Sequence, residues 1–149
     1  MRKYVLMAIL SLLAIPSLRA QNHLSVGPLF RGELVTMENC VLSDVTGKKL
    51  KPYNLDVFRS VRFAASEEEI IQVGSLILSD SRKFNVGSKN IEFNKDLMVY
   101  ALISFEADNE KNEYLGYQLK SVDGKYYVTL VFLKGDATAD DLRVIFKKR

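Results

Sequence analysis

The chain has 149 residues and a formal net charge of +3. Three of its 21 basic residues, Arg2, Lys3 and Arg19, lie in the first 20 positions, so the rest of the chain carries 18 basic and 18 acidic side chains. Because that remainder is neutral, it lacks the positive field typical of nucleic-acid binding, and we expect no nucleic-acid partner. The single histidine, His23, and the single cysteine, Cys40, exclude a four-ligand structural zinc site and an intrachain disulfide.

The N-terminus has the pattern of a secretory signal peptide. Two basic residues precede an apolar run over residues 4–15, and Ala20-Gln21 follows as the expected cleavage site. The run is shorter than the ~20 apolar residues that span a bilayer, which favours cleavage over anchoring. We therefore expect a signal peptide over residues 1–20, one α+β domain over residues 21–149, no transmembrane segment after cleavage, and a periplasmic or secreted location.

The mature domain needs no cross-link for stability, since a chain of this size can bury roughly two-thirds of its unfolded surface. In an oxidising compartment Cys40 is either buried and inert or exposed and able to link two chains. The sequence leaves both states open.

The mature chain begins with an arm and a strand. Residues 21–32 form a short apolar segment interrupted by Gly27-Pro28, which we expect to pack on the domain as an N-terminal arm. Residues 34–45 have strand character, and Val41 and Leu42 are expected to make apolar contacts there.

A boundary follows at residues 51–54, because Pro52 disfavours helical geometry in the residue before it and Asn54 is a common helix cap. We expect one helical turn over residues 55–58. Alternation of apolar and polar residues over 60–65 then predicts a second strand.

The clearest helix start is at Ser66. The Ser66 hydroxyl can accept a hydrogen bond from the Glu69 backbone while the Glu69 side chain reaches back. A wide apolar arc continues to about Asp80, which indicates burial against a sheet. Residues 81–96 are polar, and we expect a long surface connection that can hold a short strand at residues 91–93.

Residues 97–134 predict a three-stranded antiparallel meander. Asp123-Gly124 lies between two strand-like runs, the signal for a two-residue type I′ hairpin in which Tyr117 faces Leu130. For the preceding strand, a five-residue loop at residues 108–112 would place Ile103 opposite Tyr117 as well. The three strands then share one apolar face, and that face fixes their register.

The chain ends in an expected second helix over residues 139–147, which Thr138 can cap. The fold predicted from these elements is α+β: an antiparallel sheet of about five strands that ends in a three-stranded meander, with one face covered by two helices.

The order of these features resembles a known group of proteins. The stretches that carry the resemblance are Tyr53-Asn54-Leu55-Asp56-Val57-Phe58-Arg59-Ser60, Leu133-Lys134-Gly135-Asp136 and Asp140-Asp141-Leu142, placed among a signal peptide, an arm, two strands, a helix and the meander. This layout resembles the small secreted proteins of Bacteroidetes that are classed as domains of unknown function. The resemblance implies an α+β fold and a cell-envelope setting, and it brings no catalytic residues.

Residues suited to catalysis are few. A nucleophilic triad would need His23 as its base, because it is the single histidine. A triad base must be held in place by a third group, and a residue this close to the mature N-terminus is poorly suited to that. Acidic clusters at residues 67–69 and 140–141 are typical of helix starts, and Asp108 with Glu110 is typical of a solvated hairpin tip. No catalytic residue, metal ligand or cofactor is expected. The alternative is a small envelope hydrolase that uses a carboxylate pair across a cleft.

The second face of the meander is the candidate binding surface. It carries amphipathic rings and hydrogen-bonding groups on rigid strands, at Tyr100, Tyr114, Gln118, Lys120 and Tyr127. Tyrosines are enriched in protein contacts and can stack on sugars. The sequence therefore favours a non-enzymatic module that binds a protein or a cell-envelope component, unless another segment covers these rings.

Overall fold

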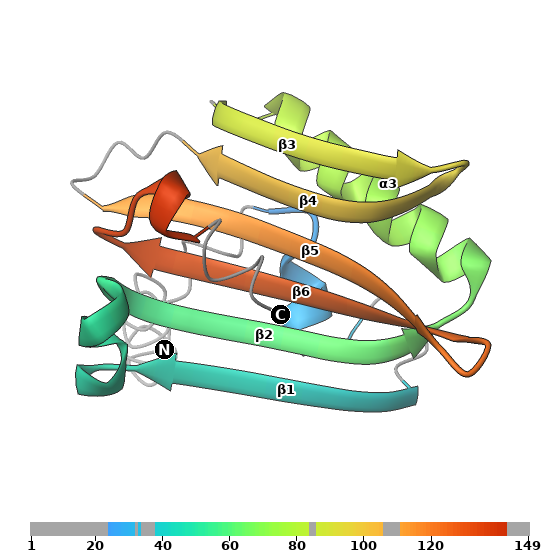
Figure 1. The fold of residues 1–149 in the computed structure, drawn as a ribbon, viewed down its shortest axis with the longest axis horizontal. Coiled ribbons are helices and arrows are strands. Elements are labelled where there is room, and N and C mark those ends of the chain that lie inside the picture. Colours follow the sequence, from blue (N-terminus) through green and yellow to red (C-terminus); the bar gives the residue numbers. More distant parts are fainter. Residues whose placement is uncertain (1–23, 32, 34–37, 84–85, 106–110, 143–149) are drawn as a thin grey trace, which may run out of the picture.

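The computed structural model describes residues 24–31, 33, 38–83, 86–105 and 111–142. Within these ranges six strands form an antiparallel sheet in the order β1-β2-β6-β5-β4-β3 (Figure 1). The strands are β1 (Glu38–Thr46), β2 (Leu55–Ala65), β3 (Val86–Asn94), β4 (Leu97–Phe105), β5 (Asn112–Val122) and β6 (Lys125–Gly135). The helices are α3 (Glu67–Lys83) and two short 3-10 helices, η2 (Gly27–Arg31) and η3 (Lys48–Tyr53). The α+β prediction is thus confirmed, with six strands in place of about five.

The β5–β6 hairpin forms as the sequence predicts. Val122 pairs with Lys125, and Tyr117 pairs with Leu130. Asp123 and Gly124 in the turn have φ values of 52° and 79°, the positive values that a type I′ turn requires at both positions.

The β4–β5 pairing differs from the prediction by two residues. Ile103 pairs with Leu115 and not with Tyr117, so two fewer residues connect the paired positions than the prediction assumed. The side chains stay on their predicted faces, because a shift of two preserves the alternation. Near the start of β4 the register shifts between Glu92 and Phe93, which leaves Val99 as an extra residue and puts Met98 in the core.

The helix α3 and the N-terminal arm cover the same face of the sheet, and both lie behind the strands in Figure 1. The arm contributes four buried side chains to this core, Leu24, Val26, Leu29 and Phe30. From α3 come Ile70, Val73 and Ile77, and the sheet adds residues that include Phe63, Ile103, Tyr117, Leu130 and Phe132. The predicted packing of the arm is therefore confirmed for residues 24–31.

A buried carboxylate joins the arm to α3. Asp80 is 0% exposed, and its Oδ1 and Oδ2 accept hydrogen bonds from the backbone N–H groups of Ser25 (2.6 Å) and Val26 (3.2 Å). The two donors satisfy both oxygens, which is how a buried polar group avoids a desolvation penalty. The arm is therefore fixed by hydrogen bonds as well as by apolar packing.

The opposite face of the sheet carries a second core, which corrects the expectation that two helices cover one face. Residues 139–142 are helical and lie in front of the strands in Figure 1. Their Leu142 and the preceding Ala137 are buried against sheet residues. The other buried members of this second core are Leu50, Leu55, Leu102, Tyr114, Val131 and Leu133. Residues 137–142, called the C-terminal segment below, therefore cover part of the face opposite α3.

The first half of the chain departs from the prediction at β2. The helical turn expected over residues 55–58 is wrong, because β2 already begins at Leu55 and the turn, η3, lies before it. Asn54 closes η3 in the left-handed conformation (φ 57°) and does not start a helix. In β1 the side chains of Val41 and Leu42 are 60% and 51% exposed, so neither belongs to the core as expected.

The polar stretch after α3 is mostly a strand, so the short strand expected at residues 91–93 is present as part of a longer one and the surface connection is wrong. Residues 86–94 form β3, which pairs with β4 along its length at the edge of the sheet. Most of its side chains are exposed, and only Val86 and Ile91 are partly buried against the core. An edge strand with so little burial has no apolar alternation to reveal it.

Two expectations concern other parts of the chain. Cys40 lies on β1 at intermediate exposure and packs against the core beneath α3. The predicted signal peptide lies outside the described residues. Among the helices that the structure describes, none is long and apolar enough to cross a membrane.

Candidate binding surface

The face opposite α3 is divided into a covered part and a polar part. The C-terminal segment and η3 cover the end nearest the start of β2, where the second core lies. Toward the β5–β6 turn, on the right in Figure 1, the same face carries side chains that are exposed or half-buried. We call this region the polar half-face; it consists of Arg62, Tyr100, Gln118, Lys120, Tyr127 and Thr129.

Strand pairing brings these six residues together. Tyr100 pairs with Gln118, Gln118 with Thr129, and Thr129 with Arg62, so one row of side chains crosses four strands. Lys120 pairs with Tyr127 in the next row. Directly paired residues point to the same side of a sheet with their Cβ atoms about 5 Å apart. The polar half-face is therefore a continuous and rigidly held surface.

An arginine stacked on a tyrosine lies near the centre of this surface. The Arg62 guanidinium lies 5.0 Å from the centroid of the Tyr127 ring, within the range of a cation–π contact. Tyr127 pairs with Ala64, two residues along β2 from Arg62, which makes this contact a diagonal one across the strands. Such a contact is attractive because the face of the ring carries the negative part of its quadrupole.

The predicted site residues divide into two groups. Tyr100, Gln118 and Tyr127 are half-buried and Lys120 is exposed, so the structure places these four on the polar half-face. Tyr114 is only 2% exposed, and its hydroxyl donates a hydrogen bond of 2.6 Å to the carbonyl of Ala137. Burial raises the pKa of the Tyr114 phenol. Its ring therefore belongs to the second core, because the C-terminal segment covers it.

Arg62 is the surface residue that sequence reasoning missed. Its alternation with Val61 and Phe63, both fully buried, indicates that its side chain points away from the core. The sequence does not reveal that β2 pairs with β6, which is the pairing that brings Arg62 to Tyr127. The sequence could therefore show which way the Arg62 side chain points, but not that Tyr127 lies beside it.

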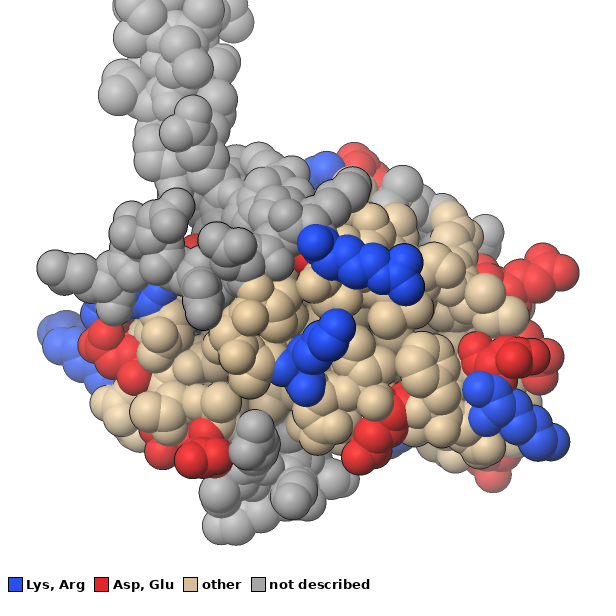
Figure 2. All heavy atoms as spheres, turned by 90° about the horizontal axis from the view of Figure 1, so that it is seen from above, with Lys and Arg blue, Asp and Glu red and all other residues tan. Residues whose placement is uncertain are grey.

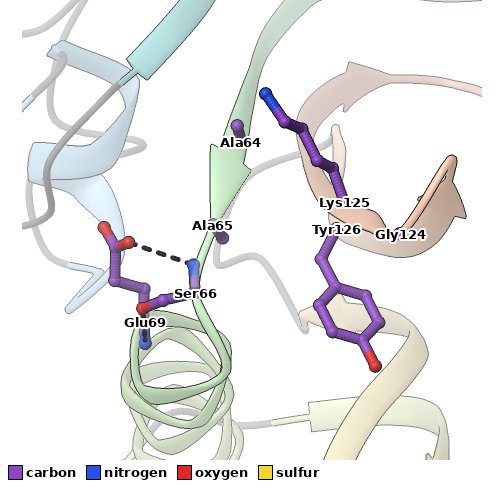
Figure 3. A pocket seen from close by; sticks show the side chains of 7 residues that line it. All are labelled: Ala64, Ala65, Ser66, Glu69, Gly124, Lys125 and Tyr126. Carbon is purple, nitrogen blue, oxygen red and sulfur yellow. Dashed lines mark hydrogen bonds between the residues drawn. The ribbon is translucent and has the colours of Figure 1, made fainter.

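A shallow hollow of about 370 Å³ adjoins the polar half-face where β2 ends. It is lined by Ala64, Ala65, Ser66, Glu69, Gly124, Lys125 and Tyr126 (Figure 3). In Figure 3 Lys125 extends toward Ala64, Tyr126 points the opposite way, and the Glu69 carboxylate turns toward Ser66. The polar groups of the hollow do not converge, whereas an enzyme pocket needs convergent titratable groups.

The acidic clusters cap helices, as the sequence indicates. Ser66 and Glu69 form a reciprocal pair of hydrogen bonds (3.2 and 3.1 Å), and Thr138 and Asp141 form another (3.2 and 3.0 Å). Hydrogen bonds from the backbone and hydroxyl of Thr138 lower the pKa of Asp141. Among the described residues no group of three or more His, Cys, Asp or Glu side chains is placed to hold a metal ion.

Charges of both signs are interspersed on the side of the molecule nearest β3 (Figure 2). The same is true of the surroundings of Tyr127. Arg62 is stacked on its ring, Lys120 pairs with it across the strands, and Lys125 lies two residues earlier on the same face of β6. Glu38 pairs with Ala64, which pairs with Tyr127, so the row that holds Tyr127 contains residues of both signs.

Comparisons with known proteins give a family and no activity. A search of the curated proteins finds no match. The model of a family described as a family of unknown function (DUF6108) matches residues 13–146. The match confirms the resemblance at the level of the family, while a Bacteroidetes origin stays a prediction. The matched region spans most of the chain, so the chain belongs to the family of unknown function DUF6108.

Proposed function

We propose that this protein is an exported, non-enzymatic binding module that captures a protein or another cell-envelope component. The observation that supports this function best is the polar half-face, where Tyr100, Tyr127 and Arg62 lie on paired strands. Tyrosine and arginine are enriched among the residues that carry most of the energy of an interface. Rigid strands also lower the entropy that these side chains lose on binding.

The hydrolase alternative has less support among the described residues. Glu69 Oε1 and Asp141 Oδ2 cap helices, while Glu69 Oε2 is buried without a hydrogen-bond partner among the described residues. The one hollow described above places Lys125, Tyr126 and Glu69 apart and not around a common point. Asp108 and Glu110, the third acidic pair considered, lie outside the described residues.

The experiment that tests the function is capture from an envelope extract. The mature chain, beginning at Gln21, is compared with a Tyr100→Ala/Tyr127→Ala double variant. Because central aromatic residues carry much of the binding energy, we expect capture of the partner to fall at least about tenfold. Tyr53→Ala is the matched control, since Tyr53 is 53% exposed and lies on η3, outside the polar half-face.

Two further measurements accompany the capture experiment: the unfolding stability of the variants and the mass of the N-terminus. The double variant should lose less stability than a core variant, because half-buried rings lose mainly cross-strand contacts. Undiminished capture by the folded double variant would reject the polar half-face as the binding surface. Mass spectrometry should find a processed chain beginning near Gln21, and Met1 retained in a cytoplasmic fraction would reject export.

A further inference from the structure

We propose that two copies of this chain dimerise by pairing their β1 strands antiparallel, about a two-fold axis that passes through Leu42. The inference goes beyond the proposed binding function, because it concerns an edge of the sheet and not the polar half-face. An edge strand has a row of backbone N–H and C=O groups that faces away from the sheet and can pair with another chain. The described sheet ends in β1 on one side and β3 on the other, and these edges differ in how well they are protected.

The β3 edge carries devices that oppose pairing. Its register with β4 shifts twice, between Val86 and Ser88 and between Glu92 and Phe93, and Lys89 lies near its centre. Bulges and lysines keep an edge strand from accepting another strand. Pairing of β1 with β3 of a second copy would also leave one edge of each copy open, so the assembly would continue as a filament.

The β1 edge lacks these devices over most of its length. Its nine residues include no lysine or proline, and its register shift lies before Val41, so that residues 41–46 pair regularly with β2. Val41 and Leu42 are 60% and 51% exposed, and they point to opposite sides of the sheet because they are consecutive. Among the described residues no segment lies beyond β1 (Figure 1). A strand added there would pair the open backbone groups and cover both apolar side chains.

The charges along β1 favour a second copy of the same strand. Glu38 begins β1, whereas the exposed Lys48 and Lys49 follow its end. Antiparallel pairing of two copies therefore brings the acidic start of each strand to the basic end of the other, and opposite charges across paired strands are stabilising. The other charge on β1, Asp44, is already paired with Arg59 on β2 at 3.5 Å.

The side chains also select the position of the axis. With Leu42 on the axis, it faces Leu42 of the second copy, and Asp44 faces the uncharged Cys40. Moving the axis to Ser43 would place Leu42 opposite Asp44, and moving it to Val41 would bring Glu38 near Asp44, where like charges repel. An axis at Leu42 avoids both arrangements.

The dimer should be weak and should have its two binding surfaces on one side. β1 has nine residues, whereas each side of a standard stable interface contributes about 20–30, so we expect a dissociation constant in the micromolar range. The axis is perpendicular to the sheet, since the two strands join into one continuous antiparallel sheet. Both polar half-faces therefore lie on the same side of the dimer, where an extended partner can contact both.

Sedimentation velocity of the mature chain, beginning at Gln21, tests the dimer over a range of concentrations, with a reducing agent that keeps Cys40 from linking chains. We expect a reversible equilibrium between monomer and dimer. Leu42→Lys should weaken it at least about tenfold, because it removes an apolar contact and places two like charges on the axis. Ile71→Lys is the matched control, because Ile71 is 47% exposed on α3, and it should leave the equilibrium unchanged.

A disulfide locates the axis. In Cys40→Ser/Leu42→Cys the two introduced thiols would face each other, and the Cα separation of about 4.5–5.5 Å between directly paired residues suits a disulfide. We expect a covalent dimer on mild oxidation. Cys40→Ser/Thr46→Cys is the matched control, because Thr46 is also exposed on β1 but lies four residues from Leu42. Its two copies would be roughly 26 Å apart and should not link.

Three results would overturn the inference. A chain that stays monomeric far above micromolar concentration would mean that β1 does not pair with itself. A series of oligomers that grows with concentration would indicate pairing of β1 with β3. A dimer that Leu42→Lys leaves intact, or that does not cross-link in the Leu42→Cys variant, would have another interface. None of these results depends on capture by the polar half-face, so the dimer and the proposed function can fail separately.

Discussion

Replacing Asp80 tests whether the N-terminal arm is fixed by its hydrogen bonds. Asp80→Ala removes the acceptor of the Ser25 and Val26 N–H groups, which then lie buried or partly buried without a partner. A buried donor left unsatisfied costs about 1–3 kcal/mol, so the two together should lower the free energy of unfolding by about 2–5 kcal/mol. Asp80→Asn keeps one acceptor oxygen and should cost about half as much.

Urea unfolding followed by circular dichroism gives the free energies, and amide hydrogen exchange reports the arm directly. The amides of Ser25 and Val26 should exchange faster in Asp80→Ala than those in the centre of the sheet. Glu68→Gln is the matched control, because it removes an exposed charge from the same helix and should cost less than about 1 kcal/mol. A loss below about 1 kcal/mol in Asp80→Ala, with unchanged exchange in the arm, would refute the reasoning.

Two further predictions concern the two cores. Leu130→Ala should cost about 2–5 kcal/mol in urea unfolding, because Leu130 is 0% exposed under α3, and a loss below about 0.5 kcal/mol would mean that it is not core. The pKa of Asp141 is lowered in the folded chain from its ordinary value of 3.8. The ionised Asp141 therefore stabilises the folded chain above pH 3.8, and this stabilisation is lost as the pH falls through the lowered pKa. Stability curves of the wild type and Asp141→Asn should therefore converge at low pH, and a constant gap would contradict this.

The β5–β6 hairpin could be predicted from sequence because several local signals agree there. Asp123-Gly124 supplies the positive φ angles, and apolar alternation on both strands selects the same register. The helix caps at Ser66 and Thr138 were predictable for the same reason, since each depends on residues three positions apart. Features that depend on residues close together in the sequence can be predicted from the sequence.

The β3–β4 hairpin escaped prediction because its turn lacks the usual residues. Lys95 takes the positive φ of 57° in the turn, a position where glycine or asparagine is the common signal. The strand β3 also buries little, so its alternation is weak. Neither the turn nor the strand gave a local signal strong enough to compete with a loop.

The candidate site was predictable in part, and the limits arise from contacts distant in sequence. Tyr114 lies on the predicted face, but Ala137, 23 positions later, accepts its hydrogen bond and the segment there covers its ring. Arg62 comes to Tyr127 only through the pairing of β2 with β6. The role of Asp80 had one local signal, because an acid in the last turn of a helix opposes the dipole and calls for another partner.

The link between the arm and α3 also sets an order of events during synthesis. The anchoring carboxylate lies 55 positions after Ser25 and 54 after Val26. At ~5–20 residues per second the ribosome needs roughly 3 to 11 seconds to make that stretch, so the arm emerges well before its partner exists. During this interval its four apolar side chains are available to a chaperone or a protease. The arm is thus synthesised early and placed late, and its protection from proteolysis would report that α3 has folded.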